Sequence, residues 1–321
     1  MSGLQIRILT SAEELVQLCP MWEAICSDGD YTLFQSFDLN LLAARMFACR
    51  ERPCIVCAEA SYGTAIIPAV VRHTDSSLRL VGDELFDYRC FLHQGEPEIL
   101  RAALAALAER GLQLEVVAMR EKEARALPHE LSLTPFCAAP AVSGQEISGE
   151  DFATKHLRLA RNLRRLGRLG FALHSYQGDY PGLLRFIYQK KAAQNESSLF
   201  HDPLRVEFMV NAAMMMPNRF EIFTLEDEAS IAAAVMTLRE DGCRRFYTGW
   251  FAPELEKHSP ALSLIYEVTR KSLEAGLDCD YMTGEQPYKL RLATSAVQLY
   301  RLRANAEELA AAGHIAAIQA A

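Results

Sequence analysis

The chain has 321 residues, half of them hydrophobic, which is enough for about two domains and excludes a single small module. Lys and Arg number 33 against 41 Asp and Glu, so the net charge is −8 and the overall charge argues against a DNA-binding protein. No apolar run is long enough to span a membrane, and no basic stretch precedes an apolar one near the start. We therefore expect a cytoplasmic protein without membrane insertion.

Nine cysteines are scattered through the chain, and an odd, unpatterned set favours reduced thiols over a disulfide framework. Cys54 and Cys57 form a CxxC pair, but the surrounding sequence is typical of a strand and contains no second CxxC or pair of histidines. We therefore expect buried strand thiols and no bound metal.

The first half of the chain combines helical and strand patterns. A turn at Tyr62-Gly63 separates two apolar runs, and Gly111 follows a helix rich in Ala and Leu. In chain order the patterns predict a strand at 5–9, helices at 11–26 and 37–50, paired strands at 55–60 and 64–73, a helix at 98–110 and a strand at 112–119.

The second half follows the same order after a loop-like stretch at 128–149. Asp202-Pro203 is a typical helix start, and Gly276 is placed to end a later helix. The predicted elements are a strand at 171–177, helices at 181–194 and 202–215, paired strands at 219–226 and 230–238, a helix at 260–275 and a strand at 277–282.

The two halves are related by a constant offset. Gly111 and Gly276 are 165 residues apart, and so are Val70 and Val235. This repeat predicts two superposable α/β halves rather than one long doubly wound sheet. We expect an N-terminal half at 1–140, a linker with a basic helix at 141–170, and a C-terminal half at 171–321.

The basic segment between the halves has six cations and no acid. These are Lys155, Arg158, Arg161, Arg164, Arg165 and Arg168. On a helix, four of the arginines share one stripe, and Leu159, Leu163 and Leu166 form the opposite, buried stripe. The stripe of arginines is either a solvated face or an anion-binding ridge in an otherwise acidic protein.

Most of the chemical signal lies in residues 246–293. The strand FYTGWF leads through a polar turn into a helix with Ser259 at the N-cap and Pro260 at the first helical position. The free amides and positive dipole of such a helix end suit a pyrophosphate. After this helix, acids and a lysine surround the turn at Thr283-Gly284, where buried acids would be costly without a purpose.

The order of hairpin, strand, Ser-Pro loop, helix, Gly and strand, followed by D-x-x-x-G-E-x-x-Y-K, resembles the GNAT acetyltransferase superfamily. In particular it resembles the CelD/BcsL group associated with cellulose and exopolysaccharide synthesis, whose two GNAT-like halves are similar to those of Fem-type aminoacyltransferases. The matching segments are LRLARNLRRLGRLG, GDELFDYRCF (82–91) and, most specifically, GEQPYK.

This resemblance implies a tandem GNAT-like (acyl-CoA N-acyltransferase) fold of layered α/β architecture, with a degenerate first half and an acyl-donor site in the second. It implies transfer of an acyl group, acetyl by preference, from acyl-CoA to an amine or hydroxyl of a small acceptor. The acceptor would be sugar-like or amino-acid-like, or anionic, in polysaccharide or cell-envelope biosynthesis. The alternatives are aminoacyl transfer from aminoacyl-tRNA and a non-catalytic scaffold.

The resemblance also assigns binding residues. The acyl-CoA site would comprise Lys257, His258, Ser259, Ala261 and Leu262. Ala261 departs from the pattern, because the group commonly has glycine after Ser-Pro. The acceptor would be bound by Arg161, Arg165, Asp87, Tyr88 and Lys289.

Four residues are candidates for the chemistry. Glu285 is the leading general base, and the alternative is an i to i+4 salt bridge with Lys289. Tyr288 or Tyr281 would protonate the leaving thiolate, unless these rings only pack in the core. Asp280 would position the acceptor amine or merely cap the following turn.

Overall fold

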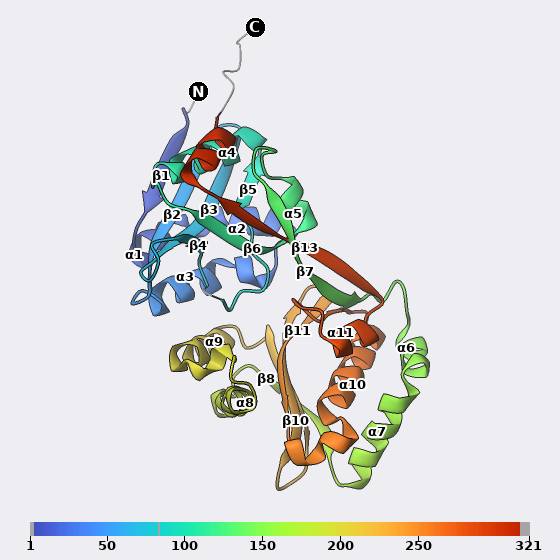
Figure 1. The fold of residues 1–321 in the computed structure, drawn as a ribbon. Coiled ribbons are helices and arrows are strands. Elements are labelled where there is room, and N and C mark those ends of the chain that lie inside the picture. The colour runs from blue at the N-terminus through green and yellow to red at the C-terminus, as the bar shows by residue number, and fades with distance from the viewer. Residues whose placement is uncertain (1–2, 83, 315–321) are drawn as a thin grey trace. The chain divides into compact units, whose positions relative to one another are not determined.

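The computed structural model describes residues 3–82 and 84–314 (Figure 1). The chain divides into two compact units, of which the second is Ala138–Val297 and the first comprises the residues before and after it. Within the described ranges, no helix has the length and apolar character needed to cross a membrane.

The first unit is built on a mixed sheet in the order β1-β2-β3-β4-β6-β13. Its strands are β1 (Gln5–Leu9), β2 (Glu51–Ala60), β3 (Gly63–Arg72), β4 (Leu78–Leu80), β6 (Leu114–Arg120) and β13 (Ser295–Ala304). Strands β4 and β6 are parallel, paired at Leu78 and Leu114, and the other neighbours are antiparallel. A further strand, β5 (Leu92–Gly95), pairs with β3.

Helices surround this sheet and supply much of its core. They are α1 (Ala12–Leu15), α2 (Cys19–Asp28), α3 (Phe37–Met46), α4 (Pro97–Ala108), α5 (Glu121–Arg125) and α12 (Ala306–Ala312). The Ala and Leu spacing of α4 gives it a wide buried face, which packs on β2 and β3. Beyond α4 the chain turns at Gly111, whose φ of 67° is accessible to glycine without strain.

The second unit has a sheet in the order β8-β9-β10-β11-β12-β7. The strands are β7 (Leu133–Val142), β8 (Ala172–Gln177), β9 (Phe220–Glu226), β10 (Ile231–Glu240), β11 (Cys243–Phe251) and β12 (Asp278–Asp280). Strands β11 and β12 are parallel, and the other neighbours are antiparallel.

Two groups of helices cover the second sheet. Figure 1 shows α6 (Gly149–Lys155), α7 (Leu157–Arg168) and α10 (Pro260–Glu274) on one face, and α8 (Pro181–Gln194) and α9 (Pro203–Met215) on the other. A short helix, α11 (Pro287–Leu292), follows β12. The core between α10 and the sheet includes Leu264, Val268, Val235 and Phe246.

The two units have the same strand order, which confirms the predicted pair of similar halves. Each runs from an N-terminal edge strand through an antiparallel hairpin to a parallel pair, and ends on an antiparallel strand. The parallel pair is bridged by α4 in the first unit and by α10 in the second, and both helices are followed by a glycine with positive φ, Gly111 and Gly276.

The boundaries of the units differ from the predicted division at two places. Residues 298–314 group with the first unit, because β13 pairs with β6 and α12 packs on α4. Residues 141–170 group with the second unit instead of forming a linker, since α6 and α7 both pack on α10.

Candidate functional site

The candidate site of the second unit begins where the parallel pairing between β11 and β12 ends. Their parallel ladder runs from Cys243 beside Asp278 to Arg245 beside Asp280, whereas β11 continues to Phe251. The register between β10 and β11 shifts so that Tyr247 is an extra residue. Such a bulge bends its strand and increases the local twist. The bulge therefore lies at the point where the parallel pairing stops.

From β11 the chain leads into the N-terminus of α10. The intervening turn, Pro253–His258, places exposed Lys257 and half-buried His258 just before the helix. Ser259 occupies the predicted N-cap position, but its backbone is left-handed (φ 49°) and its side chain makes no capping bond. Ala261 and Leu262 follow in the first turn, both half-buried.

The charges at this helix end favour an anion. The first turn of α10 has no acidic residue, although Glu254 and Glu256 lie in the turn before it, so no carboxylate of the helix itself opposes the dipole and the free amides. In the first unit the corresponding helix, α4, has Glu96 at its N-cap and Glu98 in its first turn. A phosphate is therefore favoured at α10 and disfavoured at α4.

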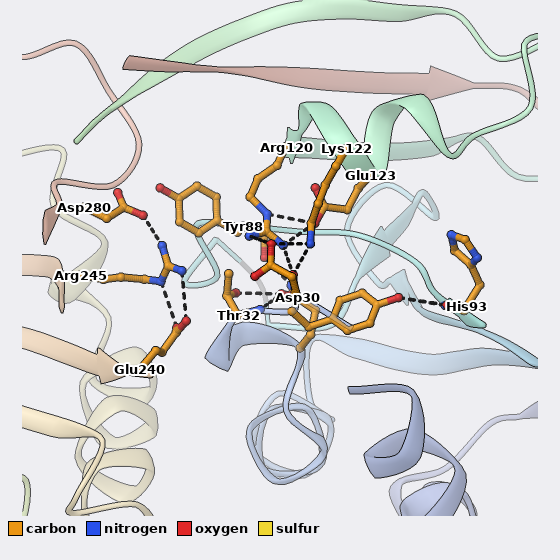
Figure 2. A network of polar contacts seen from close by, with 12 residues as sticks. Asp30, Thr32, Tyr88, His93, Arg120, Lys122, Glu123, Glu240, Arg245 and Asp280 are labelled. Atoms are coloured by element: carbon orange, nitrogen blue, oxygen red, sulfur yellow. Dashed lines mark hydrogen bonds and ion pairs between the residues drawn. The ribbon is translucent and has the colours of Figure 1, made fainter. Parts of the chain in front are cut away.

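A largely buried ion-pair cluster joins β10, β11 and β12 where the parallel pairing ends (Figure 2). Arg245 donates two hydrogen bonds of 3.0 Å to the carboxylate of Glu240 and another to Asp280. Burial opposes the charged guanidinium, but Asp280 and Glu240 raise the pKa of Arg245 above its usual range. Asp280 also accepts a 2.6 Å bond from the amide of Met282. It therefore ties the end of β12 to the following loop.

The loop after β12 presents Glu285 to solvent. Met282 and Gly284 have φ values of 62° and 102°, which give this loop its sharp path. The ammonium of Lys289 is buried and donates to the carbonyl oxygen of Thr283 at 2.6 Å. Glu285 itself is exposed. This geometry favours Lys289 as an anchor of the loop backbone over the alternative salt bridge with Glu285.

The two candidate tyrosines have different environments. Tyr281 is 1% exposed, and its hydroxyl lies 3.0 Å from that of Thr269. Burial raises the pKa of Tyr281 well above its usual value, and the ring packs on Phe246. Tyr288 is 36% exposed, although packing around its phenol still raises its pKa. The surroundings of Tyr281 favour core packing, whereas Tyr288 is accessible to a ligand.

The basic helix α7 has the predicted division of faces. Leu159 and Leu166 are buried against the core, and Leu163 is half-buried against the same cluster. The exposed side carries Arg158, Arg161, Arg164, Arg165 and Arg168. None of these arginines forms an ion pair with another residue that the structure describes. The helix therefore exposes a stripe of uncompensated positive charge.

The first-unit candidates Asp87 and Tyr88 lie in the segment after β4. Tyr88 is 3% exposed, its ring packs edge-on against Phe34, and its carbonyl oxygen accepts a 2.7 Å bond from Gln35. Asp87 is half-buried. These contacts show how Tyr88 is held within the first unit.

Sequence reasoning missed two features of the site. The pairing of Arg245 with Glu240 and Asp280 was not anticipated, although two consecutive arginines in an otherwise apolar strand were a visible signal. The extra residue at Tyr247 has no local signature, because a bulge depends on the register of two strands. Among the described residues, no group of three or more His, Cys, Asp or Glu is arranged to hold a metal ion.

Comparison with known proteins agrees with this architecture. Residues 152–290 match the family model described as acetyltransferase (GNAT) domain. A search of curated proteins found no significant match to the sequence. The family match covers α7 and the whole path from β8 through α10 to Glu285 and Tyr288.

Solved structures share the fold over nearly the whole chain. The C-terminal domain of a putative lysylphosphatidylglycerol synthetase from Agrobacterium fabrum has a TM-score of 0.61 at 12% identity, covering 94% of this chain and 95% of that one. FemX has a TM-score of 0.61 at 7% identity, covering 93% and 96%. A tandem GNAT protein from the clavulanic acid biosynthesis pathway has a TM-score of 0.54 at 10% identity, covering 95% and 99%. The chain thus has the tandem GNAT-like fold of these structures, and residues 152–290 are similar to the acetyltransferase (GNAT) domain.

Proposed function

We propose that the protein transfers an acyl group from acyl-CoA to an amine or hydroxyl of a small acceptor. The observation that carries this proposal is the path of the GNAT domain, in which β11 separates from β12 at a bulge and leads into a helix N-terminus without acids. The open edge of a strand can pair with the amide groups of coenzyme A, and the helix N-terminus that follows it can bind the pyrophosphate. The reaction is proposed to take place in the cytoplasm.

The acyl donor would be held by the residues around Ser259. The backbone amides of Ala261 and Leu262 would bind the pyrophosphate, and Lys257 and His258 would add side-chain donors. The left-handed backbone occurs at Ser259 rather than at Ala261, so only Ser259 adopts the conformation for which glycine is usually needed.

In the proposed chemistry, the acceptor nitrogen or oxygen attacks the thioester carbonyl, its proton passes to a base, and the C–S bond breaks to release the thiol of coenzyme A. Glu285 would take the proton, directly or through one water. Tyr288 would protonate the departing thiolate, and its raised pKa keeps the phenol protonated at neutral pH. Asp280 and Lys289 would position the loop that carries Glu285, through Met282 and Thr283.

The acceptor class is proposed from the resemblance to the CelD/BcsL group and from the charge of α7. That group implies a sugar-like acceptor in polysaccharide or cell-envelope biosynthesis. Arg161 and Arg165, which are exposed and have no ion-pair partner in the described part of the chain, suit an anionic substituent on this acceptor. Asp87 and Tyr88 remain proposed acceptor contacts, although the packing of Tyr88 favours a structural role.

Aminoacyl transfer from aminoacyl-tRNA is a second candidate, favoured by the same helix. Five exposed arginines without ion-pair partners among the described residues would bind the phosphates of an RNA. The similarity in fold to FemX is consistent with this alternative. The net charge of −8 weighs against it, because most of the surface would repel RNA.

Calorimetric titration of the full chain with acetyl-CoA, CoA and tRNA separates these functions. We expect acetyl-CoA and CoA to bind and tRNA not to bind. Binding of tRNA alone would favour the second candidate, and binding of none of the three would favour a non-catalytic scaffold. Ala261→Asp should abolish acyl-CoA binding by placing a carboxylate at the helix N-terminus. The control Ala193→Asp adds the same charge at an exposed position of α8 and should bind acyl-CoA normally.

A further inference from the structure

The exposed face of α7 carries apolar side chains as well as arginines. Leu157 is the first residue of the helix and Leu169 is its C-cap, and both are 52% exposed. Residues four apart share one face of a helix, so the two leucines lie in one stripe with Arg161 and Arg165. At 1.5 Å per residue, the leucines are about 18 Å apart along the helix axis. This face is therefore basic along its length and apolar at both ends.

The positive charge of this face is not balanced by its neighbours. Its five arginines have no ion-pair partner within residues 3–82 and 84–314. On α10, the helix on which α7 packs, Glu267 pairs with Arg270 at 2.7 Å, and Glu274 pairs with the same arginine. The whole chain has a net charge of −8, so the chain outside α7 is more acidic still. An anionic surface is therefore attracted by α7 and repelled by most of the remaining surface.

The apolar face of α7 is already occupied. Leu159 and Leu166 are 6% and 0% exposed and belong to the core of the second unit. A free amphipathic helix binds a membrane by burying such a face among the lipids, and a helix-binding protein takes the same face into a groove. Neither arrangement is open to α7. What remains is contact through the arginines, with a surface that is negatively charged over about the length of the helix.

We propose that the arginine face of α7 docks the protein on an anionic membrane surface. The arginine side chains reach the lipid phosphates and donate hydrogen bonds to them. Leu157 and Leu169 enter the layer between the headgroups, which removes their exposed apolar surface from water. Figure 1 shows α10 between α7 and the sheet, so the rest of the second unit lies on the side of α7 away from the lipid.

The exposed leucines favour a membrane over the other anionic partners. Single-stranded RNA is held largely by stacking of its bases on aromatic rings, and α7 contains no aromatic residue. A free phosphate or a small anionic acceptor is held by one or two arginines, which leaves the other arginines and both leucines without a role. A bilayer supplies many phosphates together with an apolar layer. This proposal goes beyond acyl transfer and does not depend on it.

Vesicle sedimentation with the full chain tests the proposal. The probes are vesicles of phosphatidylglycerol and phosphatidylcholine in equal amounts, and vesicles of phosphatidylcholine alone. We expect saturable binding to the first and none to the second. Binding should weaken as NaCl is raised from about 0.05 M to about 0.5 M, because salt screens exposed charges. An excess of soluble glycerol 3-phosphate should not release the protein, since a single phosphate does not replace a charged surface.

A pair of arginine substitutions assigns the binding to α7. Arg158→Gln with Arg168→Gln removes the two charges next to the leucines in sequence and should lower the affinity for anionic vesicles about fivefold for each arginine. The control, Arg52→Gln with Arg110→Gln, removes the same charge from exposed positions of the first unit that also lack ion-pair partners in the described part of the chain. It should bind vesicles as the wild type does.

A pair of leucine substitutions separates a membrane from the other anions. Leu157→Gln with Leu169→Gln should lower the affinity for anionic vesicles by roughly threefold or more, because apolar surface no longer leaves water. The control, Met214→Gln with Met215→Gln, changes two exposed apolar side chains at the end of α9 and should bind as the wild type does. All four positions are on the surface, so the melting temperature should stay within a few degrees.

Several results would overturn the proposal. They are absence of binding to the anionic vesicles, equal binding to both kinds of vesicle, and an equal loss of binding in the control with changed Arg52 and Arg110. Release by glycerol 3-phosphate would also overturn it and make α7 a site for a free anion. Binding of tRNA that is lost in the arginine pair and kept in the leucine pair, without vesicle binding, would make α7 an RNA-binding face. Vesicle binding requires neither acetyl-CoA nor turnover, so its failure is distinguishable from failure of the acyl-transfer proposal.

Discussion

Replacing Glu285 by Gln removes a carboxylate while keeping the size and polarity of the side chain. Glu285 is exposed, and the loop that carries it is held by hydrogen bonds of Asp280 and Lys289 rather than by the side chain of Glu285. Surface substitutions of this kind change stability by less than about 0.5 kcal/mol. Loss of a general base lowers the rate by about 10²–10⁴, or about 2.7–5.4 kcal/mol of activation free energy. The expected kinetic effect is therefore at least five times the expected effect on folding.

The assay follows thiol release from acetyl-CoA with a panel of amine and hydroxyl acceptors, beside thermal unfolding and calorimetry with acetyl-CoA. Glu285→Gln should keep the melting temperature and the affinity for acetyl-CoA while losing most turnover. Its residual rate should rise with pH, because the acceptor amine then loses its proton to water. The control Glu228→Gln makes the same change at an exposed position in the β9–β10 turn and should be fully active.

Full activity in Glu285→Gln would remove this residue from the mechanism. Attention would then move to Asp280, whose carboxylate is already engaged by Arg245 and by the amide of Met282. A large drop in the melting temperature with unchanged turnover per folded molecule would instead make Glu285 a structural residue of the loop.

Three further outcomes follow from the structure. In denaturant titrations, Tyr281→Phe should lower the free energy of unfolding by about 0.5–1.5 kcal/mol but retain acyl transfer, because the hydroxyl of Tyr281 is buried. A loss of activity without a loss of stability would contradict this. Reversing the charges of Arg161 and Arg165 to Glu should leave the melting temperature within a few degrees and weaken binding of an anionic acceptor. An equal loss of stability would show a structural role. Burial lowers the pKa of His93 and His156 below 6.5, so the unfolded chain binds more protons than the folded chain near this pH. The free energy of unfolding should therefore fall as the pH drops through 6.5. Urea titrations at several pH values check this.

The repeated order of elements was readable from the sequence because it depends on local patterns. The Ala and Leu face of α4 and the glycines that follow α4 and α10 are features of a few consecutive residues. The partner of each sheet's last strand was not readable. Strand β13 joins the first unit and the end of β7 joins the second, and nothing within either segment specifies which sheet it completes.

The sequence predicted which residues to consider for the site better than it predicted what each of them contacts. The motif GEQPYK was singled out by resemblance, and the structure shows a loop, an exposed Glu285 and a helix start at Pro287. The sequence could not show that Lys289 turns inward to the carbonyl oxygen of Thr283, because that choice depends on the path of the loop. Likewise, Ser259 was a typical N-cap by residue type, and only its left-handed backbone shows that it does not cap in the usual way.

The two halves share a strand order but differ in charge at the helix that bridges the parallel pair. Glu96 and Glu98 place two carboxylates at the start of α4, whereas the first turn of α10 has none. The turn before α10 carries Lys257 together with Glu254 and Glu256. A diphosphate is repelled by the first arrangement and attracted by the second. We therefore expect calorimetry to give one acyl-CoA per chain, with Ala261→Asp removing all of the binding heat. A stoichiometry of two, or binding that survives in Ala261→Asp, would show that the charge at the helix start does not decide where the donor binds.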